Sequence, residues 1–139
     1  MDNEYLLVHH QIFLINLSRL KIITETTKAD STLVLVEQAR EYLQLTISKF
    51  GAQARIKDIA NSLQVDSDKL CRLHQKYYQC SLLDYRNQLL LEIIVLQLDN
   101  YTNQFAALAI ELSFSGHSEL NRFFKKMTGY SLNQYKNLK

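Results

Sequence analysis

The 139-residue chain contains no proline, no tryptophan and only three glycines. Sheet sandwiches, Rossmann units and phosphate-binding loops depend on glycine at their turns, so this scarcity argues against all three. The two cysteines, behind an acidic N-terminus that does not resemble a secretory leader, give no disulfide framework. No apolar run approaches the length that spans a bilayer. Because 47% of the residues are apolar, the composition predicts an all-α, cytoplasmic protein with a packed core and no membrane partner.

Apolar residues recur at helical spacing along most of the chain. An N-terminal helix is expected over residues 4–23, followed by a polar linker. A second helix is expected to begin at Asp30 or Ser31 and to end at Gly51. The remaining expected helices cover residues 56–63, 67–78, 81–99, 104–112, 117–127 and 131–138.

Two stretches of the chain repeat one pattern. Residues 56–78 and 104–127 each hold two short helices separated by a tight turn, which is the arrangement of a helix-turn-helix unit. Ala60 with Ala109, Leu70 with Leu120, and Arg72 with Arg122 match at a spacing of 49 or 50 residues. The expected fold is therefore two helix-turn-helix units joined by a long central helix, plus an N-terminal helical extension. The expected divisions are residues 1–30, 31–100 and 101–139.

The formal charge of +2 is distributed unevenly. Residues 1–51 carry five basic and six acidic groups, and residues 52–100 carry six of each. Residues 101–139 carry five basic groups against two acidic ones, so the positive excess lies in the second unit.

The second unit also carries a specific motif. Its residues are Leu108-Ala109, Phe114, Ser118, Arg122, Phe124-Lys125-Lys126, Thr128-Gly129 and Tyr135. These residues resemble the DNA-binding domain of the AraC/XylS family of bacterial transcription regulators, and the resemblance extends over residues 33–139. It implies a DNA-binding regulator that is not an enzyme and needs no cofactor, with double-stranded DNA as its partner. A homodimer through residues 4–23 and contact with RNA polymerase are further candidate interactions.

Several residues depart from the family pattern. Gln64, Gln79 and Ser113 stand where the family usually has glycine, His74 replaces a phenylalanine, and Leu90 replaces an arginine. We expect the fold to tolerate these changes, with Leu90 packed in the core. DNA binding by the first unit is expected to be the weaker of the two.

The first residues of each second helix are the expected DNA contacts, because a recognition helix presents its N-terminal side chains to the major groove. They are Asp68, Cys71, Arg72 and Gln75 in the first unit and His117, Ser118, Asn121, Arg122, Lys125 and Lys126 in the second. Arg122 can form two hydrogen bonds with guanine, and Asn121 can form hydrogen bonds with adenine. Lys125, Lys126 and the backbone amides near Ser115 are placed to bind phosphates. Asp66 and Asp68 would repel phosphate, which favours the second unit as the main binder.

Other patterns in the sequence are weaker. Cys71, His74 and Cys80 suggest zinc but lack an evident fourth ligand, so no metal site is predicted. No nucleophile–histidine set lies in one motif, and catalysis is not expected. Most of six tyrosines are expected to be half-buried packing residues with hydroxyls in water: Tyr77, Tyr78, Tyr85, Tyr101, Tyr130 and Tyr135. A second hypothesis is a protein-interaction module, or a dominant-negative partner of a regulator, with weak DNA binding.

Overall fold

The computed structural model describes residues 31–101 and 104–138, and these residues form a helical fold without a strand. Its α-helices are α2 (Ser31–Phe50), α3 (Ile56–Ser62), α4 (Ser67–Tyr78), α5 (Leu82–Gln97), α6 (Phe105–Glu111), α7 (His117–Thr128) and α8 (Leu132–Asn137). Two short 3₁₀ helices, η1 (Gly51–Gln53) and η2 (Leu98–Tyr101), were not expected. The all-α prediction is confirmed, whereas the helix and dimer interface predicted over residues 4–23 lie outside the described residues.

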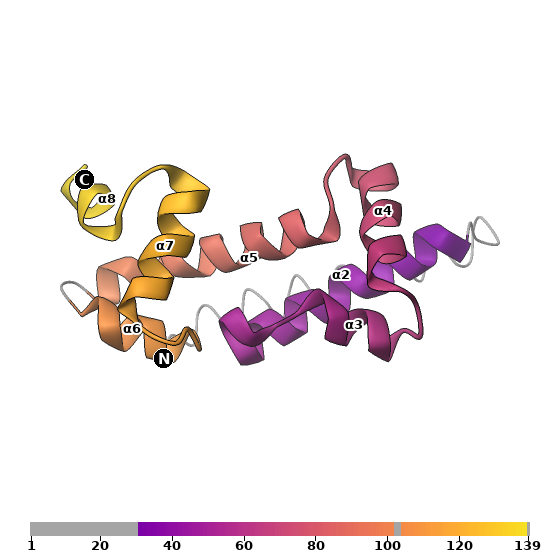
Figure 1. The fold of residues 1–139 in the computed structure, drawn as a ribbon, viewed down its shortest axis with the longest axis horizontal. Helices are drawn as coiled ribbons and strands as arrows, with labels where there is room; N and C mark the ends of the chain where they lie inside the picture. Colours follow the sequence, from indigo (N-terminus) through magenta and orange to yellow (C-terminus); the bar gives the residue numbers. More distant parts are fainter. Residues whose placement is uncertain (1–30, 102–103, 139) are drawn as a thin grey trace.

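Helix α5 is the central element of this arrangement (Figure 1). Its 16 residues span about 24 Å at 1.5 Å per residue. Helices α2, α3 and α4 gather around its beginning, and α6, α7 and α8 gather around its end (Figure 1). The two second helices of the repeat, α4 and α7, each run crosswise to α5 near its opposite ends (Figure 1).

Local sequence sets the ends of these helices. Ser81 and Ser131 each accept a hydrogen bond on the side chain from the third amide of the helix that follows. In return, the amide of each serine donates to a side-chain oxygen, of Asp84 for Ser81 and of Gln134 for Ser131. Such capping boxes satisfy amides that a helix start leaves without partners. The helices α5 and α8 thus begin in the same way, at positions 50 residues apart.

One hydrophobic cluster connects α2 to α8. The helical spacing of α2 predicts an apolar face of Leu33, Val36, Ala39, Leu43 and Ile47; all of these are buried except Leu33, which is half-buried. Leu90 is fully buried in α5, which confirms its predicted place in the core. Burial of a leucine side chain contributes about 1.5–3 kcal/mol to stability.

A buried polar cluster between α2 and α4 was not predicted. Arg40 Nη1 lies 2.8 Å from Nε2 of His74, whose Nδ1 lies 2.6 Å from the Cys80 carbonyl oxygen. Because an arginine can only donate, Nε2 accepts and Nδ1 carries the proton, so His74 is a neutral imidazole. Burial, together with the nearby Arg40 charge, lowers the pKa of His74 below its usual 6.5. His74 therefore fills the place of a core aromatic and also fixes the end of α4.

The tyrosines beside His74 correct one prediction. The Arg40 guanidinium lies over the rings of Tyr78 and Tyr85, at 3.8 and 3.9 Å from their centroids. The hydroxyl of Tyr78 donates to Glu37, that of Tyr85 accepts from Gln44, and that of Tyr77 bonds to Thr32. The expectation of hydroxyls in water is wrong for these three tyrosines, because α2 supplies their polar partners.

Candidate nucleic-acid interface

The two helix-turn-helix turns share one backbone geometry. The Val65 amide donates to the Ala60 carbonyl at 3.0 Å, and the Phe114 amide donates to the Ala109 carbonyl at 2.8 Å. The residue before each of these donors has a left-handed backbone conformation, with φ of 58° at Gln64 and 63° at Ser113. The sequence repeat is therefore also a repeat of hydrogen bonds and dihedral angles, and it sets α4 and α7 in the same way on the helices before them.

Helix α4 packs against the core through Leu70 and His74 and turns its other side to solvent. Asp66 caps its N-terminus by accepting a hydrogen bond from the Lys69 amide at 3.1 Å. Of the predicted contacts, Asp68, Arg72 and Gln75 are exposed, as is required of side chains that meet DNA.

Helix α7 repeats this register with Leu120 and Phe124 in the core. All the predicted contacts of this unit except Asn121 are exposed: His117, Ser118, Arg122, Lys125 and Lys126. The His117 ring lies 5.6 Å from the ring of Phe105 in α6, which limits its orientation at the start of the helix.

The start of α7 corrects the predicted phosphate contact. Glu119 folds back so that its carboxylate accepts hydrogen bonds from the Ser115 amide, at 2.8 Å, and from the Ser115 hydroxyl. These two bonds lower the pKa of the Glu119 carboxyl. The Ser115 amide is therefore already satisfied by a carboxylate and is not open to a phosphate.

Two of the predicted base contacts share a half-buried register position. Cys71 packs against the hydrophobic cluster. Asn121, 50 residues later, accepts a hydrogen bond on Oδ1 from the Leu132 amide at 2.9 Å. Since Leu132 begins α8, Asn121 holds the start of the last helix in addition to any contact with DNA.

The exposed surface of α4 carries two cations that were not among the predicted DNA contacts, Lys69 and Lys76. With Arg72 they give α4 three exposed cations, as many as Arg122, Lys125 and Lys126 give α7. Lys69, Arg72 and Lys76 are spaced by three and four residues, so helical register alone could have predicted that the two lysines share the exposed face of α4 with Arg72. The two units differ in their acids instead: Asp68 occupies in α4 the position of Ser118 in α7, whereas Glu119 of α7 stands at the position of Lys69.

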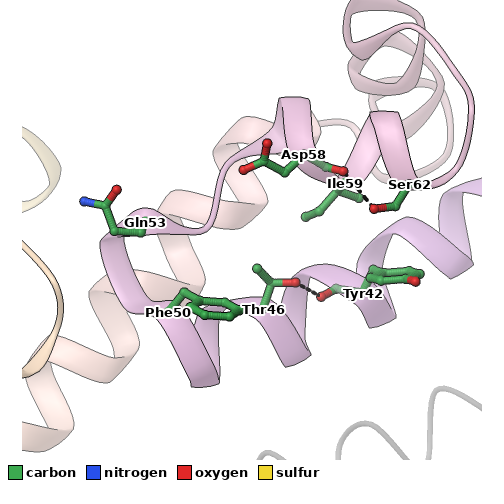
Figure 2. A pocket seen from close by; sticks show the side chains of 7 residues that line it. All are labelled: Tyr42, Thr46, Phe50, Gln53, Asp58, Ile59 and Ser62. Atoms are coloured by element: carbon green, nitrogen blue, oxygen red, sulfur yellow. Dashed lines mark hydrogen bonds between the residues drawn. The ribbon is translucent and has the colours of Figure 1, made fainter.

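A groove of about 320 Å³ lies between α2 and α3, apart from α4 and α7. Figure 2 shows its lining by Tyr42, Thr46, Phe50, Gln53, Asp58, Ile59 and Ser62. Within residues 31–101 and 104–138, no three His, Cys, Asp or Glu side chains form a group that could hold a metal ion. None of the described helices is long and apolar enough to cross a membrane.

Comparison with known proteins gives one match. The model of a family described as a helix-turn-helix domain matches residues 59–137, which is more than half of the chain. No curated protein and no solved structure matches the chain.

Proposed function

This chain belongs to the AraC-type helix-turn-helix family of DNA-binding regulators, and from that premise we propose that α4 and α7 enter adjacent major grooves on one face of a duplex. The observation that carries this proposal is the shared register of the two helices. Arg72 and Arg122 are both exposed, and each follows by two residues a leucine that is fully buried. Two helices in the same register can present equivalent side chains to two successive turns of the duplex, which are about 34 Å apart.

We propose further that the second unit provides most of the binding free energy. Asp66 caps α4 and Asp68 is exposed beside it, so two carboxylates stand at the end of the helix that approaches DNA. Their charges oppose phosphate, although they favour the helix dipole. At the corresponding positions α7 has Gly116 and Ser118, which carry no charge.

The experiment starts from duplexes that the wild-type protein selects from a random pool. Affinity is then measured by fluorescence anisotropy for Arg122→Ala, for Arg72→Ala and for the control Lys49→Ala, which removes an exposed charge at the end of α2. We expect Arg122→Ala to weaken binding about 5- to 150-fold, which corresponds to about 1–3 kcal/mol for one base contact. Arg72→Ala is expected to weaken it less, and Lys49→Ala is expected to leave it unchanged.

Two results would count against these proposals. If Arg122→Ala binds as wild type does, α7 is not the recognition helix. If Arg72→Ala weakens binding as much as Arg122→Ala, the second unit does not dominate.

The same titration tests a second function, a protein-interaction module with weak DNA binding. The carboxylates Asp66 and Asp68, and the Ser115 amide occupied by Glu119, favour it because each reduces attraction for phosphate. It predicts that no sequence is enriched from the random pool and that affinity for the recovered duplexes equals affinity for random DNA.

A further inference from the structure

A second connection, separate from α5, joins the two helix-turn-helix units. The Ala52 amide in η1 donates to the Leu112 carbonyl at 2.8 Å, and Gln53 Nε2 donates to the Ser113 carbonyl at 3.0 Å. These partners are 60 residues apart in the sequence. They tie the segment after α2 to the end of α6 and to the turn that leads into α7, and we call residues 51–53 with 112–113 the joint.

Gly51 is what allows the joint to close. Its φ is +54°, and a Cβ placed on it would lie 2.3 Å from the Leu112 carbonyl oxygen. That oxygen is a backbone atom which already accepts the Ala52 hydrogen bond, so it cannot move aside without breaking the contact. Any side chain at this position would therefore push η1 and α6 apart.

Arg86 of α5 holds the other side of the joint. Its Nη2 donates to the Ala52 carbonyl at 2.7 Å, and its Nε donates to the Ala54 carbonyl at 3.0 Å. Burial lowers the pKa of Arg86, yet an arginine keeps its charge at physiological pH. Ala52 is thus fixed through both of its backbone polar groups, its amide by the second unit and its carbonyl by the central helix.

Resting on the proposed function, we propose that this joint is a positioning device that fixes the direction of α7 relative to α4 and so sets the DNA spacing that the protein accepts. The second unit is otherwise attached through η2 and through the packing of α7 on α5, and the joint adds an attachment on the side of η1 that opposes rotation of one unit about the other. The attachment acts at Ser113, which lies in the turn that aims α7 and has φ of 63°. Gly51 and Gln53 are positioning residues, because they act on DNA only through the placement of that helix.

The first experiment uses a duplex selected by the wild-type protein and the same duplex with one base pair inserted between its two contacted segments. The insertion shifts one segment by about 3.4 Å and rotates it by about 35°. For wild type and for the control Gln38→Ala, an exposed position on α2, we expect at least about fivefold weaker binding to the longer duplex, the cost of one lost base contact. For Gly51→Ala and Gln53→Ala, we expect weaker binding to the original duplex, and we expect the Kd values for the two duplexes to be nearly equal. Gln53 is exposed, so its variant keeps the test open if Gly51→Ala does not fold.

The second experiment needs no DNA, so a failure of the joint can be told from a failure of the proposed function. Spin labels are attached at Lys76→Cys and Lys126→Cys, equivalent exposed positions on α4 and α7, in a chain with both native cysteines replaced by serine. Pulsed electron resonance is expected to give one narrow distance distribution for this protein and a broader or shifted one when Gly51→Ala or Gln53→Ala is added. Distributions that do not change would overturn the proposal, as would an unchanged ratio between the two duplexes. A selection that enriches no duplex would count against the proposed function and would leave the distance measurement to decide on the joint.

Discussion

Restoring glycine at three backbone positions should stabilise this protein. Gln64, Gln79 and Ser113 have φ values of 58°, 60° and 63°, which is left-handed backbone that side chains disfavour. An L-residue there costs about 1–2 kcal/mol, and a glycine in its place costs about 0.5–1 kcal/mol in extra chain entropy. The difference predicts that each change to glycine raises the free energy of unfolding by about 0.5–1 kcal/mol.

The triple variant gives the clearest measurement. The three sites lie in separate turns, so their effects should add to about 2 kcal/mol. For a chain of this size that corresponds to a rise in Tm of about 5–10 °C. The assay is urea unfolding followed by circular dichroism, together with a thermal scan of each single variant and of the triple variant.

A glutamine in regular helix supplies the control. Gln38 is exposed within α2, where glycine in place of another residue costs up to about 1 kcal/mol. Gln38→Gly should therefore lower the free energy of unfolding while Gln79→Gly raises it. If both variants are destabilised alike, the backbone at position 79 is not left-handed and the reasoning is refuted.

Three further predictions concern the core and its polar contacts. The free energy of unfolding should fall as pH drops below 6.5, by at most about 1.4 kcal/mol per pH unit, because the unfolded chain protonates His74 before the folded one does. His74→Phe should reduce this pH dependence in urea titrations, and an unchanged pH dependence would contradict the lowered pKa of His74. Asn121→Ala should lower the free energy of unfolding by about 0.5–2 kcal/mol without DNA, because the Leu132 amide loses its acceptor; a loss of DNA binding with unchanged stability would mean that Asn121 acts only on bases. Leu90→Ala should cost about 2–5 kcal/mol, while Leu96→Ala, exposed on the same helix, should stay within about 0.5 kcal/mol; equal costs would show that Leu90 is not a core residue.

Three of the contacts that sequence reasoning missed share one cause. Glu37, Arg40 and Gln44 lie on α2, a helix whose apolar stripe predicts its core face correctly, yet all three bond to residues more than 30 positions away. Periodicity identifies which residues recur on one face of a helix, but it does not say which partner reaches them. The Glu119 contact to Ser115 is local, but the two residues are four positions apart and the N-cap of α7 is Gly116, so the three-residue spacing of a capping box does not predict it.

By itself, the sequence determined the helices, the repeat and the family. These depend on spacing within short stretches: apolar residues every three or four positions, caps at helix starts, and two copies of one pattern 49 or 50 residues apart. Only the tertiary structure decided that Asn121 holds α8, that the tyrosine hydroxyls bond to α2, and that Gly51 touches Leu112. Such contacts depend on how distant backbones approach one another, and the packing of the whole core sets that distance.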